Sequence, residues 1–197
     1  MGTKEYAKKR DLSRSGEPAG KTRKKRGKPA FVIQKHDASS LHYDFRLEVD
    51  GVLKSWAVPK GLSTDPRDKR LAIRTEDHPL DYADFEGVIP QSEYGGGTVI
   101  IWDRGTFKNI TRKKDRTVGI RSALKHGHAV VRLEGEKLSG DYTLQRIEKG
   151  DKEQWLVIKA DDEAADARRN PVSSQPRSVK TGRTVAQVAR EEAKSSP

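Results

Sequence analysis

The sequence predicts a mainly β protein, built as a closed or nearly closed antiparallel β-barrel with one or two short helices and flexible termini. Three observations support this fold class. Residues 41–50 alternate strictly between apolar and polar side chains, an Asp-Gly dipeptide follows them, and further runs rich in β-branched and aromatic residues are separated by glycine-containing turns. Many short antiparallel strands at this spacing are typical of barrels.

The clearest predicted strand covers residues 41–50. Because neighbouring side chains of a strand point to opposite faces, one face is expected to be buried and the other polar. The apolar face carries Leu41, Tyr43, Phe45, Leu47 and Val49, and the polar face carries His42, Asp44, Arg46, Glu48 and Asp50.

The Asp-Gly dipeptide predicts a type I′ turn that returns the chain as a partner strand over residues 52–59. In that register Phe45 faces Trp56 on the core side, and Arg46 faces Ser55 on the polar side. Because Ser55 is small, it leaves space above the polar face, where a ligand can bind.

A further strand is predicted at residues 70–78, RLAIRTEDH. Leu71 and Ile73 are expected to face the core. The opposite face is expected to gather charged side chains, namely Arg70, Arg74, Glu76 and His78.

The remaining elements follow from composition. Residues 97–107, 128–147 and 154–159 are predicted strands because they carry β-branched and aromatic residues between turns. Residues 118–127, VGIRSALKHG, are typical of a helix that ends at a glycine.

Charge and composition divide the 197-residue chain into three parts. Its formal net charge is +11, and residues 1–30 carry eleven Lys and Arg against three acids, so they form a basic N-terminal arm. Residues 31–160 hold all three tryptophans and form the folded domain. Residues 161–197 have few large apolar side chains, which predicts a disordered tail or linker.

Composition also excludes several classes of protein. The chain has no cysteine, so disulfides, thiolate catalysis, zinc fingers and iron–sulfur clusters are excluded. No apolar run is long enough for a membrane span, and we expect a soluble cytoplasmic protein. The arm sequence KTRKKRGK, residues 21–28, suits contact with nucleic-acid phosphates, although a solubilising terminus is an equal reading.

His36, His42 and Asp44 form a candidate metal site. His42 and Asp44 lie two apart on a strand and point the same way, and His36 comes alongside if residues 37–40 form a turn. Two imidazoles and one carboxylate suit Mn²⁺, Fe²⁺ or Zn²⁺ better than Ca²⁺ or Mg²⁺. The alternative is a polar strand face with a hydrogen-bonded His–Asp pair.

Cationic residues surround this candidate site. Arg46 continues the same face, Arg70 and His78 belong to the charged face of the next strand, and Lys60 follows the hairpin. A metal ion beside such groups is what phosphoryl chemistry requires, because the ion activates water and fixed cations stabilise the developing negative charge. A solvated strand face is the alternative for each arginine.

The chain contains five long motifs: HDASSLHYDFRLE, LKSWAVPKG, RLAIRTEDHPLDYADFEGVIP, EYGGGTVIIWDRGTF and GEKLSGDYTL. In sequence and in order they closely resemble the 3′-phosphoesterase domain of bacterial DNA ligase D. The resemblance implies a Mn²⁺-dependent DNA-repair enzyme, with Co²⁺ and Zn²⁺ as alternative metals. It further implies removal of a 3′-terminal ribonucleoside from primer–template ends, followed by hydrolysis of the 3′-phosphate left behind.

The same resemblance assigns roles to individual residues. The metal ligands it implies are His36, His42 and Asp44. The phosphate-binding and catalytic residues it implies are Arg46, Lys60, Arg70, Glu76, His78 and Tyr82, joined by Arg10, Asp11 and Glu17 of the arm. Residues 10–17 are therefore expected to fold over the site.

Two other functions remain open at this point. One is a non-catalytic nucleic-acid-binding module, and the other is a non-haem iron oxygenase, whose facial triad also uses two His and one carboxylate. The expected partners are DNA or DNA–RNA primer–template 3′ ends, with ligase and end-joining proteins as further candidates. We expect a monomer associated with the nucleoid.

Overall fold

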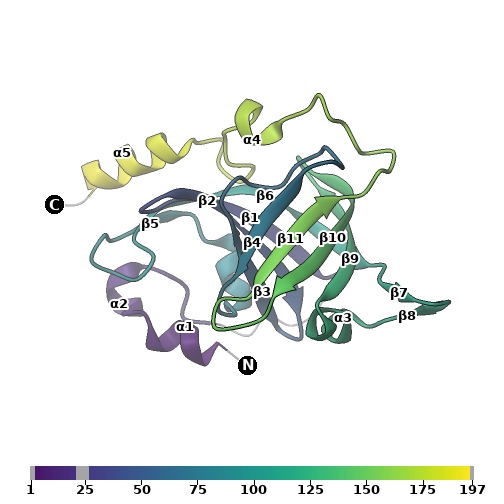
Figure 1. The fold of residues 1–197 in the computed structure, drawn as a ribbon. Helices are drawn as coiled ribbons and strands as arrows, with labels where there is room; N and C mark the ends of the chain where they lie inside the picture. Colours follow the sequence, from purple (N-terminus) through teal and green to yellow (C-terminus); the bar gives the residue numbers. More distant parts are fainter. Residues whose placement is uncertain (1–2, 21–26, 196–197) are drawn as a thin grey trace.

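A computed structural model describes residues 3–20 and 27–195 (Figure 1). Eight antiparallel strands form a closed barrel, because β1 pairs with β6 at one side and with β2 at the other, which confirms the predicted fold class. In barrel order the strands are β1 (Ala30–Asp37), β2 (Leu41–Val49), β3 (Val52–Val58), β4 (Lys69–Arg74), β11 (Gln154–Lys159), β10 (Ser139–Glu148), β9 (His128–Gly135) and β6 (Gly97–Asn109). A short strand, β5 (Gly87–Ile89), pairs with β6 outside the closed ring.

The β2–β3 hairpin has the predicted register. Asp50 and Gly51 both adopt positive φ, at 52° and 80°, as a type I′ turn requires. Phe45 pairs with Trp56, and Arg46 with Ser55. The odd-numbered residues of β2 therefore enter the barrel, and its even-numbered residues lie on the outer face.

The core fills the barrel with large aromatic side chains. Trp56, Trp102 and Trp155 are at most 2% exposed. Trp56 lies edge-on to Trp155, with ring centroids 5.8 Å apart, and Trp102 lies edge-on to Tyr43 at 5.3 Å. Such close packing holds the strands that carry the outer-face residues.

The prediction for residues 70–78 is wrong in two respects. Ala72 is fully buried in the core whereas Leu71 is 39% exposed, so the inward face is the one that carries Arg70 and Arg74. Arg74 stacks over the core residue Trp56 at 5.0 Å. The regular strand also ends at Arg74, and His78 instead forms an isolated bridge to Leu53, so Arg70 and His78 do not share a face.

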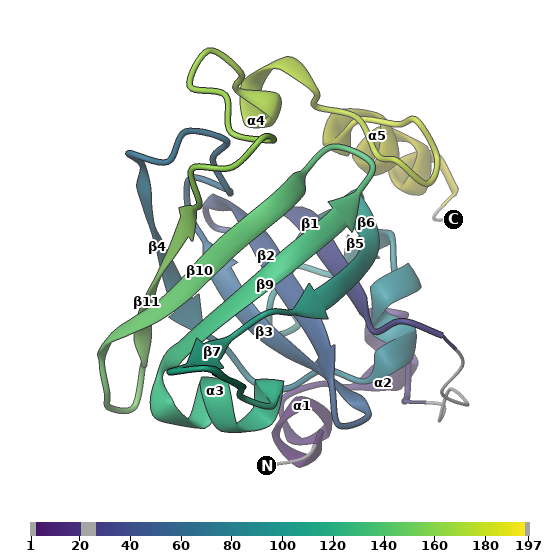
Figure 2. The ribbon, with the colours of Figure 1, turned by 90° about the vertical axis from the view of Figure 1, so that its right-hand side faces the viewer.

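Helices cap and flank the barrel. The predicted helix is confirmed as α3 (Ile120–His126), which ends at Gly127 with φ 84°. It lies below one end of the barrel, and α4 (Pro171–Ser174) lies beyond the other (Figure 2). The structure contains more helices than the one or two expected: α1 (Lys4–Lys8), α2 (Leu12–Ser15), the 3-10 helix η1 (Leu80–Asp84) and α5 (Val185–Ser195). A small hairpin, β7 (Arg112–Lys113) and β8 (Arg116–Thr117), precedes α3.

The N-terminal arm folds against the outer face of the barrel. Tyr6 of α1 is 2% exposed and donates a hydrogen bond to the carbonyl of Pro18 at 2.9 Å. Its ring packs with Tyr82 of η1 at 5.8 Å. Most of the basic run at residues 21–28 lies outside the described residues.

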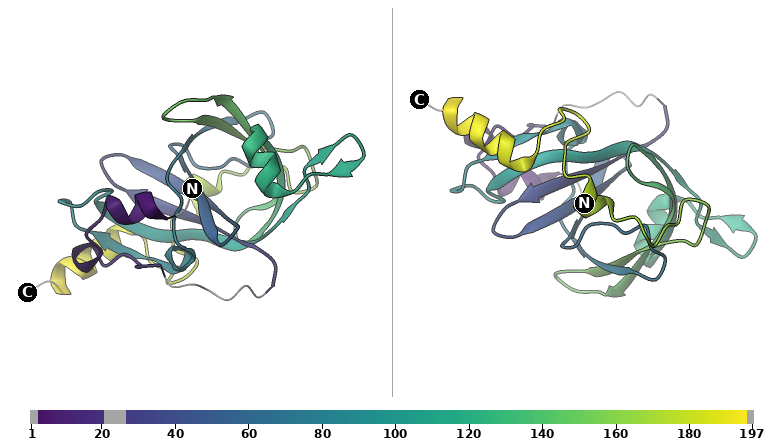
Figure 3. Two further views of the ribbon diagram at one scale, coloured as in Figure 1. Left: turned by 90° about the horizontal axis from the view of Figure 1, so that it is seen from below. Right: turned by 90° about the horizontal axis from the view of Figure 1, so that it is seen from above.

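The C-terminal segment differs from the expected disordered tail. In the structure, residues 161–195 lie along the barrel, and α5 and the arm occupy the same side of the molecule, away from β7 and β8 (Figure 3). Trp102 donates to the carbonyl of Gln175 at 2.7 Å, and Val188 is fully buried. Composition predicts disorder because it counts apolar side chains, whereas this segment docks through a few apolar side chains and through polar groups: Ser178 and Arg183 both donate to Glu86.

Within the described residues, no helix combines the length and the apolar character that crossing a bilayer would need.

Candidate metal centre and its cationic surroundings

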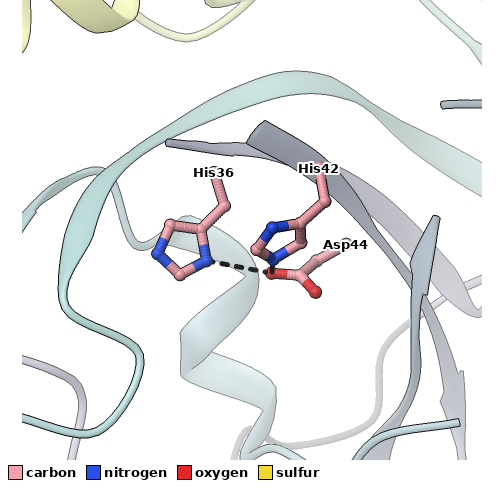
Figure 4. A group of neighbouring side chains, drawn as sticks. All are labelled: His36, His42 and Asp44. Atoms are coloured by element: carbon pink, nitrogen blue, oxygen red, sulfur yellow. Dashed lines mark ion pairs between the residues drawn. The ribbon is translucent and has the colours of Figure 1, made fainter. Parts of the chain in front are cut away.

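His36, His42 and Asp44 converge at one end of the β1–β2 pair. His36 and His42 are direct cross-strand partners because residues 38–40 form the expected turn. The three side chains point toward one another, and their ligand atoms all lie within 4.8 Å (Figure 4). The sequence prediction of this grouping is therefore confirmed in its geometry.

The spacing of the three groups suits a shared ion. Oδ2 of Asp44 lies 3.6 Å from Nδ1 of His36 and 3.7 Å from Nε2 of His42. These distances exceed a hydrogen bond, whereas two ligands bonded at about 2.1 Å to one ion lie roughly 3 to 3.6 Å apart. The arrangement can therefore accept a small divalent cation with little movement.

Hydrogen bonding prepares the imidazoles for this role. Nδ1 of His42 lies 2.9 Å from the carbonyl oxygen of Ser40, so it donates there and leaves the lone pair of Nε2 directed at the site. Nε2 of His36 is buried without a hydrogen-bond partner among the described residues. The other ring nitrogen, Nδ1, is the one that faces Asp44, and the ring of His42 lies beside that of His36, with centroids 4.8 Å apart.

Asp44 is held as a carboxylate. Burial by itself would raise the pKa of its carboxyl group, but the Arg46 guanidinium and the two imidazoles hold that pKa well below its usual range. A metal ion therefore meets an ionised ligand at neutral pH.

Arg46 links the metal site to a second cluster. This side chain is 3% exposed, and its Nη2 donates to Asp44 at 3.1 Å while its Nε donates to Gln34 at 2.7 Å. Its Nη1 lies 3.0 Å from Nδ1 of His78, and its guanidinium stacks over Tyr82 at 4.9 Å. Every edge of the guanidinium is thus held in place.

His78 is buried between guanidinium groups. Its Nδ1 also lies 2.9 Å from the carbonyl oxygen of Glu76, and its Nε2 lies 3.5 Å from Nη2 of Arg10. Because a guanidinium can only donate, a neutral ring can satisfy only some of these partners at a time. Burial, together with the charges of Arg46 and Arg10, holds the pKa of His78 well below its ordinary value.

The arm closes over this cluster through Arg10. Its Nε donates to Glu17 and its Nη1 to Glu76, both at 2.9 Å, and all three side chains are at most 5% exposed. Burial alone would lower the pKa of Arg10, but the two carboxylates raise it, and the pKa of Glu76 is lowered in return despite its burial. Arg10 thus joins the arm residue Glu17 to Glu76 of the barrel domain.

Tyr82 forms a wall of the cluster. It is 2% exposed, and its ring lies 4.8 Å from that of His78. Burial raises the pKa of its hydroxyl well above the ordinary value, so the group stays protonated.

Three of the implied site residues stand apart from the cluster. Asp11 is exposed and caps α2 by accepting from the Ser13 backbone at 3.1 Å. Lys60 is exposed just beyond β3, and Arg70 pairs with Asp68 at 2.8 Å. Strand directions place Lys60 and Arg70 at the same end of the barrel as the metal ligands.

Gln34, Tyr6 and Ser55 also belong to the cluster, although no role in the site was predicted for them. Gln34 orients Arg46, and its Nε2 donates to the carbonyls of Tyr82 and Phe85, both at 3.0 Å. One signal was available, since Gln34 is a polar residue inside an apolar run and lies two positions before His36 on the same strand face.

Comparison with known proteins shows what the chain is similar to. The model of the DNA ligase D 3′-phosphoesterase domain matches residues 34–146, which include the three candidate metal ligands. The chain is 50% identical over 186 residues to the multifunctional non-homologous end joining protein LigD of Pseudomonas aeruginosa, a match that covers 92% of this chain and 21% of that protein.

Mycobacterial relatives are similar over a shorter stretch. The LigD DNA repair protein of Mycobacterium tuberculosis is 47% identical over 153 residues, which covers 77% of this chain and 19% of that protein. LigD of Mycolicibacterium smegmatis is 43% identical over 159 residues, covering 80% of this chain and 20% of that protein. The chain thus spans about a fifth of the length of these relatives.

Proposed function

The chain belongs to the DNA ligase D 3′-phosphoesterase domain family, and on this premise we propose that it is a metal-dependent hydrolase that heals 3′ ends during DNA end joining. Its proposed substrates are DNA or DNA–RNA primer–templates. The convergence of His36, His42 and Asp44 beside Arg46 is the observation that carries this proposal.

The proposed metal is Mn²⁺, with Co²⁺ and Zn²⁺ as alternatives, held by the three converging side chains. When bound, such an ion supplies Lewis-acid polarisation of a phosphate oxygen and makes a coordinated water more acidic. Nε2 of His42 and Oδ2 of Asp44 are the atoms presented to it, and the His42–Ser40 hydrogen bond keeps that imidazole oriented.

Arg46 and Arg10 supply fixed positive charge for the phosphate. His78 and Tyr82 are buried behind the arm, so we propose that they act chiefly by holding the two guanidinium groups at the site. Glu76 and Glu17 hold Arg10 in turn. Lys60 and Arg70, at the rim, are proposed to contact phosphates of the incoming strand.

Two hydrolytic steps are proposed. In the first, a water oxygen bonds to phosphorus, and the bond to the 5′ oxygen of the terminal ribonucleoside breaks. The nucleoside leaves with a proton on that oxygen, and the primer keeps a 3′-phosphate. In the second, another water attacks the same phosphorus, the bond to the 3′ oxygen breaks, and the products are inorganic phosphate and a 3′-hydroxyl.

We further propose a nucleoid-associated monomer that works beside ligase and end-joining proteins. For the end-joining partners, the support is that the relatives are multifunctional end-joining proteins, of which this chain matches one part.

The decisive experiment uses a 5′-labelled primer–template that ends in one ribonucleotide. With Mn²⁺, a sequencing gel is expected to show the 3′-phosphate product first and the 3′-hydroxyl product later. EDTA and the His42→Ala variant are expected to abolish both. DNA binding without either product would favour the non-catalytic module, and O₂ uptake with a 2-oxo acid would favour the oxygenase.

A further inference from the structure

Tyr94 is unusual among the aromatic residues of this protein. Among the described residues, which include every Phe, Trp and Tyr of the chain, it is the one large aromatic side chain with substantial exposure, at 51%. The three tryptophans and the other four tyrosines are buried. An isolated exposed ring needs no explanation by itself, so its surroundings decide its meaning.

The loop that carries this ring approaches the candidate metal centre. A Cβ built on the next residue, Gly95, would lie 3.9 Å from Cε1 of His36. Lys9 Nζ and Arg10 Cζ lie 5.0 and 5.2 Å from the centroid of the Tyr94 ring. The ring therefore borders the cationic cluster, and the residue next to it in the chain approaches the candidate metal ligand His36.

The loop that carries Tyr94 is held in a tight turn. Gly96 donates its N–H to the carbonyl of Glu93 at 3.0 Å, and Gly95 adopts φ 78°, a conformation that favours glycine. Glu93 also lies 3.8 Å from Nε of Arg14, which ties the loop to the arm, and Figure 1 shows the loop between β5 and β6 beside α2. Binding of a ligand to this ring would cost little conformational entropy in the loop, because the turn already fixes the backbone of the loop.

Exposed aromatic rings beside cations are suited to nucleobases. Every base presents a flat π surface, so stacking on an aromatic ring tolerates any base, while neighbouring cations contact the phosphates. The last base of a primer has one face that no other base covers. An aromatic ring placed next to the scissile phosphate can cover that face.

We propose that Tyr94 is the platform on which the base of the 3′-terminal nucleoside stacks while its phosphate lies at the candidate metal centre. This inference rests on the proposed function and adds to it a residue that recognises the departing nucleoside. Stacking uses the flat surface that every base presents and not the hydrogen-bonding groups that distinguish one base from another. All four terminal bases are therefore expected to be accepted.

The test compares two primer–templates that differ only in the terminal base. One ends in a ribonucleoside, and the other ends in the same ribose without its base. The variants are Tyr94→Ala and Tyr94→Phe, and the matched control is Ile147→Ala, which removes an exposed apolar side chain from β10. KM for the first hydrolytic step is measured with Mn²⁺, and Kd is measured in EDTA by fluorescence anisotropy.

Tyr94→Ala is expected to raise KM and Kd for the base-bearing substrate by at least about fivefold and to leave both unchanged for the base-free substrate. Tyr94→Phe and Ile147→Ala are expected to behave as the wild type. An equal loss on both substrates would overturn the proposal, since it would mean that Tyr94 only anchors the arm through Lys9 and Arg10. No change on either substrate would overturn it as well.

Failure of the proposed function is distinguishable from failure of this inference. If the wild-type protein cleaves neither substrate, the hydrolase proposal fails. The Kd values in EDTA, which require no turnover, still decide whether Tyr94 contacts the terminal base.

Discussion

Arg46 donates a hydrogen bond across 3.1 Å to Oδ2 of Asp44, the same oxygen that faces both imidazoles of the candidate metal centre. The two residues lie two apart on β2 and share its outer face. The residues proposed to bind the metal and the phosphate are therefore neighbours on one short strand, and substitutions can separate their roles.

Replacing Arg46 is expected to reduce catalysis without loss of the metal. Arg46→Ala should lower kcat for both hydrolytic steps by about 10²-fold, because one fixed cation at the phosphate is removed. Mn²⁺ affinity, measured by isothermal titration calorimetry, should be unchanged or tighter, since Asp44 loses a competing positive charge. Arg121→Ala, which removes an exposed arginine of α3, is the control. Weaker Mn²⁺ binding in Arg46→Ala would contradict this division of roles.

Replacing His42 is expected to remove the metal itself. His42→Ala takes away one of three ligands and should abolish both hydrolytic steps together with Mn²⁺ binding, followed by electron paramagnetic resonance of the free ion. His128→Ala is the matched control because His128 is exposed on β9 and its Nδ1 bonds to Gln145. Full activity of His42→Ala on 3′-phosphate DNA would reject the metal assignment.

His78→Ala is expected to impair phosphate removal more than ribonucleoside removal. The variant loses the contacts that hold Arg46 and Arg10, and a dianionic monoester depends on fixed cations more than a monoanionic diester does. The two steps are measured separately, on a 3′-phosphate primer and on a ribonucleotide-terminated primer. Equal losses on the two substrates would count against this explanation.

Arg10 is expected to control the docking of the arm. Arg10→Ala leaves Glu17 and Glu76 buried without their common partner, which should weaken docking by about 3 kcal/mol. Hydrogen exchange of a peptide covering residues 3–17 should accelerate accordingly. Lys8→Ala is the control, because Lys8 is an exposed cation of the same arm. Unchanged exchange in Arg10→Ala would show that other contacts hold the arm.

The burial of His78 predicts a pH dependence of stability. An unfolded histidine takes up a proton near its ordinary pKa of 6.5, whereas the pKa of native His78 is well below that value. As the pH falls below about 6.5, the unfolded state therefore binds more protons, and the free energy of unfolding falls by up to about 1.4 kcal/mol per pH unit. Above that range both states are neutral and the contribution is constant.

Urea denaturation at pH 7.5 and at mildly acidic pH tests this linkage in metal-free, phosphate-free buffer. His78→Gln should lose less stability on acidification than the wild type, while His128→Gln should match the wild type because His128 is exposed. If the free energy of unfolding of His78→Gln falls with pH as steeply as that of the wild type, groups other than His78 cause the pH dependence.

The sequence by itself determined the barrel class, the β2–β3 register and the grouping of His36, His42 and Asp44. These features depend on local rules: the alternation of a strand, the backbone conformation of an Asp-Gly turn, and a short turn between two cross-strand partners. Because each rule acts within about ten residues, the printed sequence is enough to apply it.

Only the tertiary structure decided the rest. The inward face of β4 follows from Ala72 packing in the core and Arg74 stacking on Trp56, and alternation alone gave the opposite face. Closure of the arm through Arg10 and docking of residues 161–195 on the barrel depend on partners distant in the chain, such as Glu76 and Trp102. The physical reason is that burying a charged or polar side chain costs free energy unless the fold supplies a hydrogen-bonding or oppositely charged partner. That partner comes from a distant part of the chain, so no local sequence pattern identifies it.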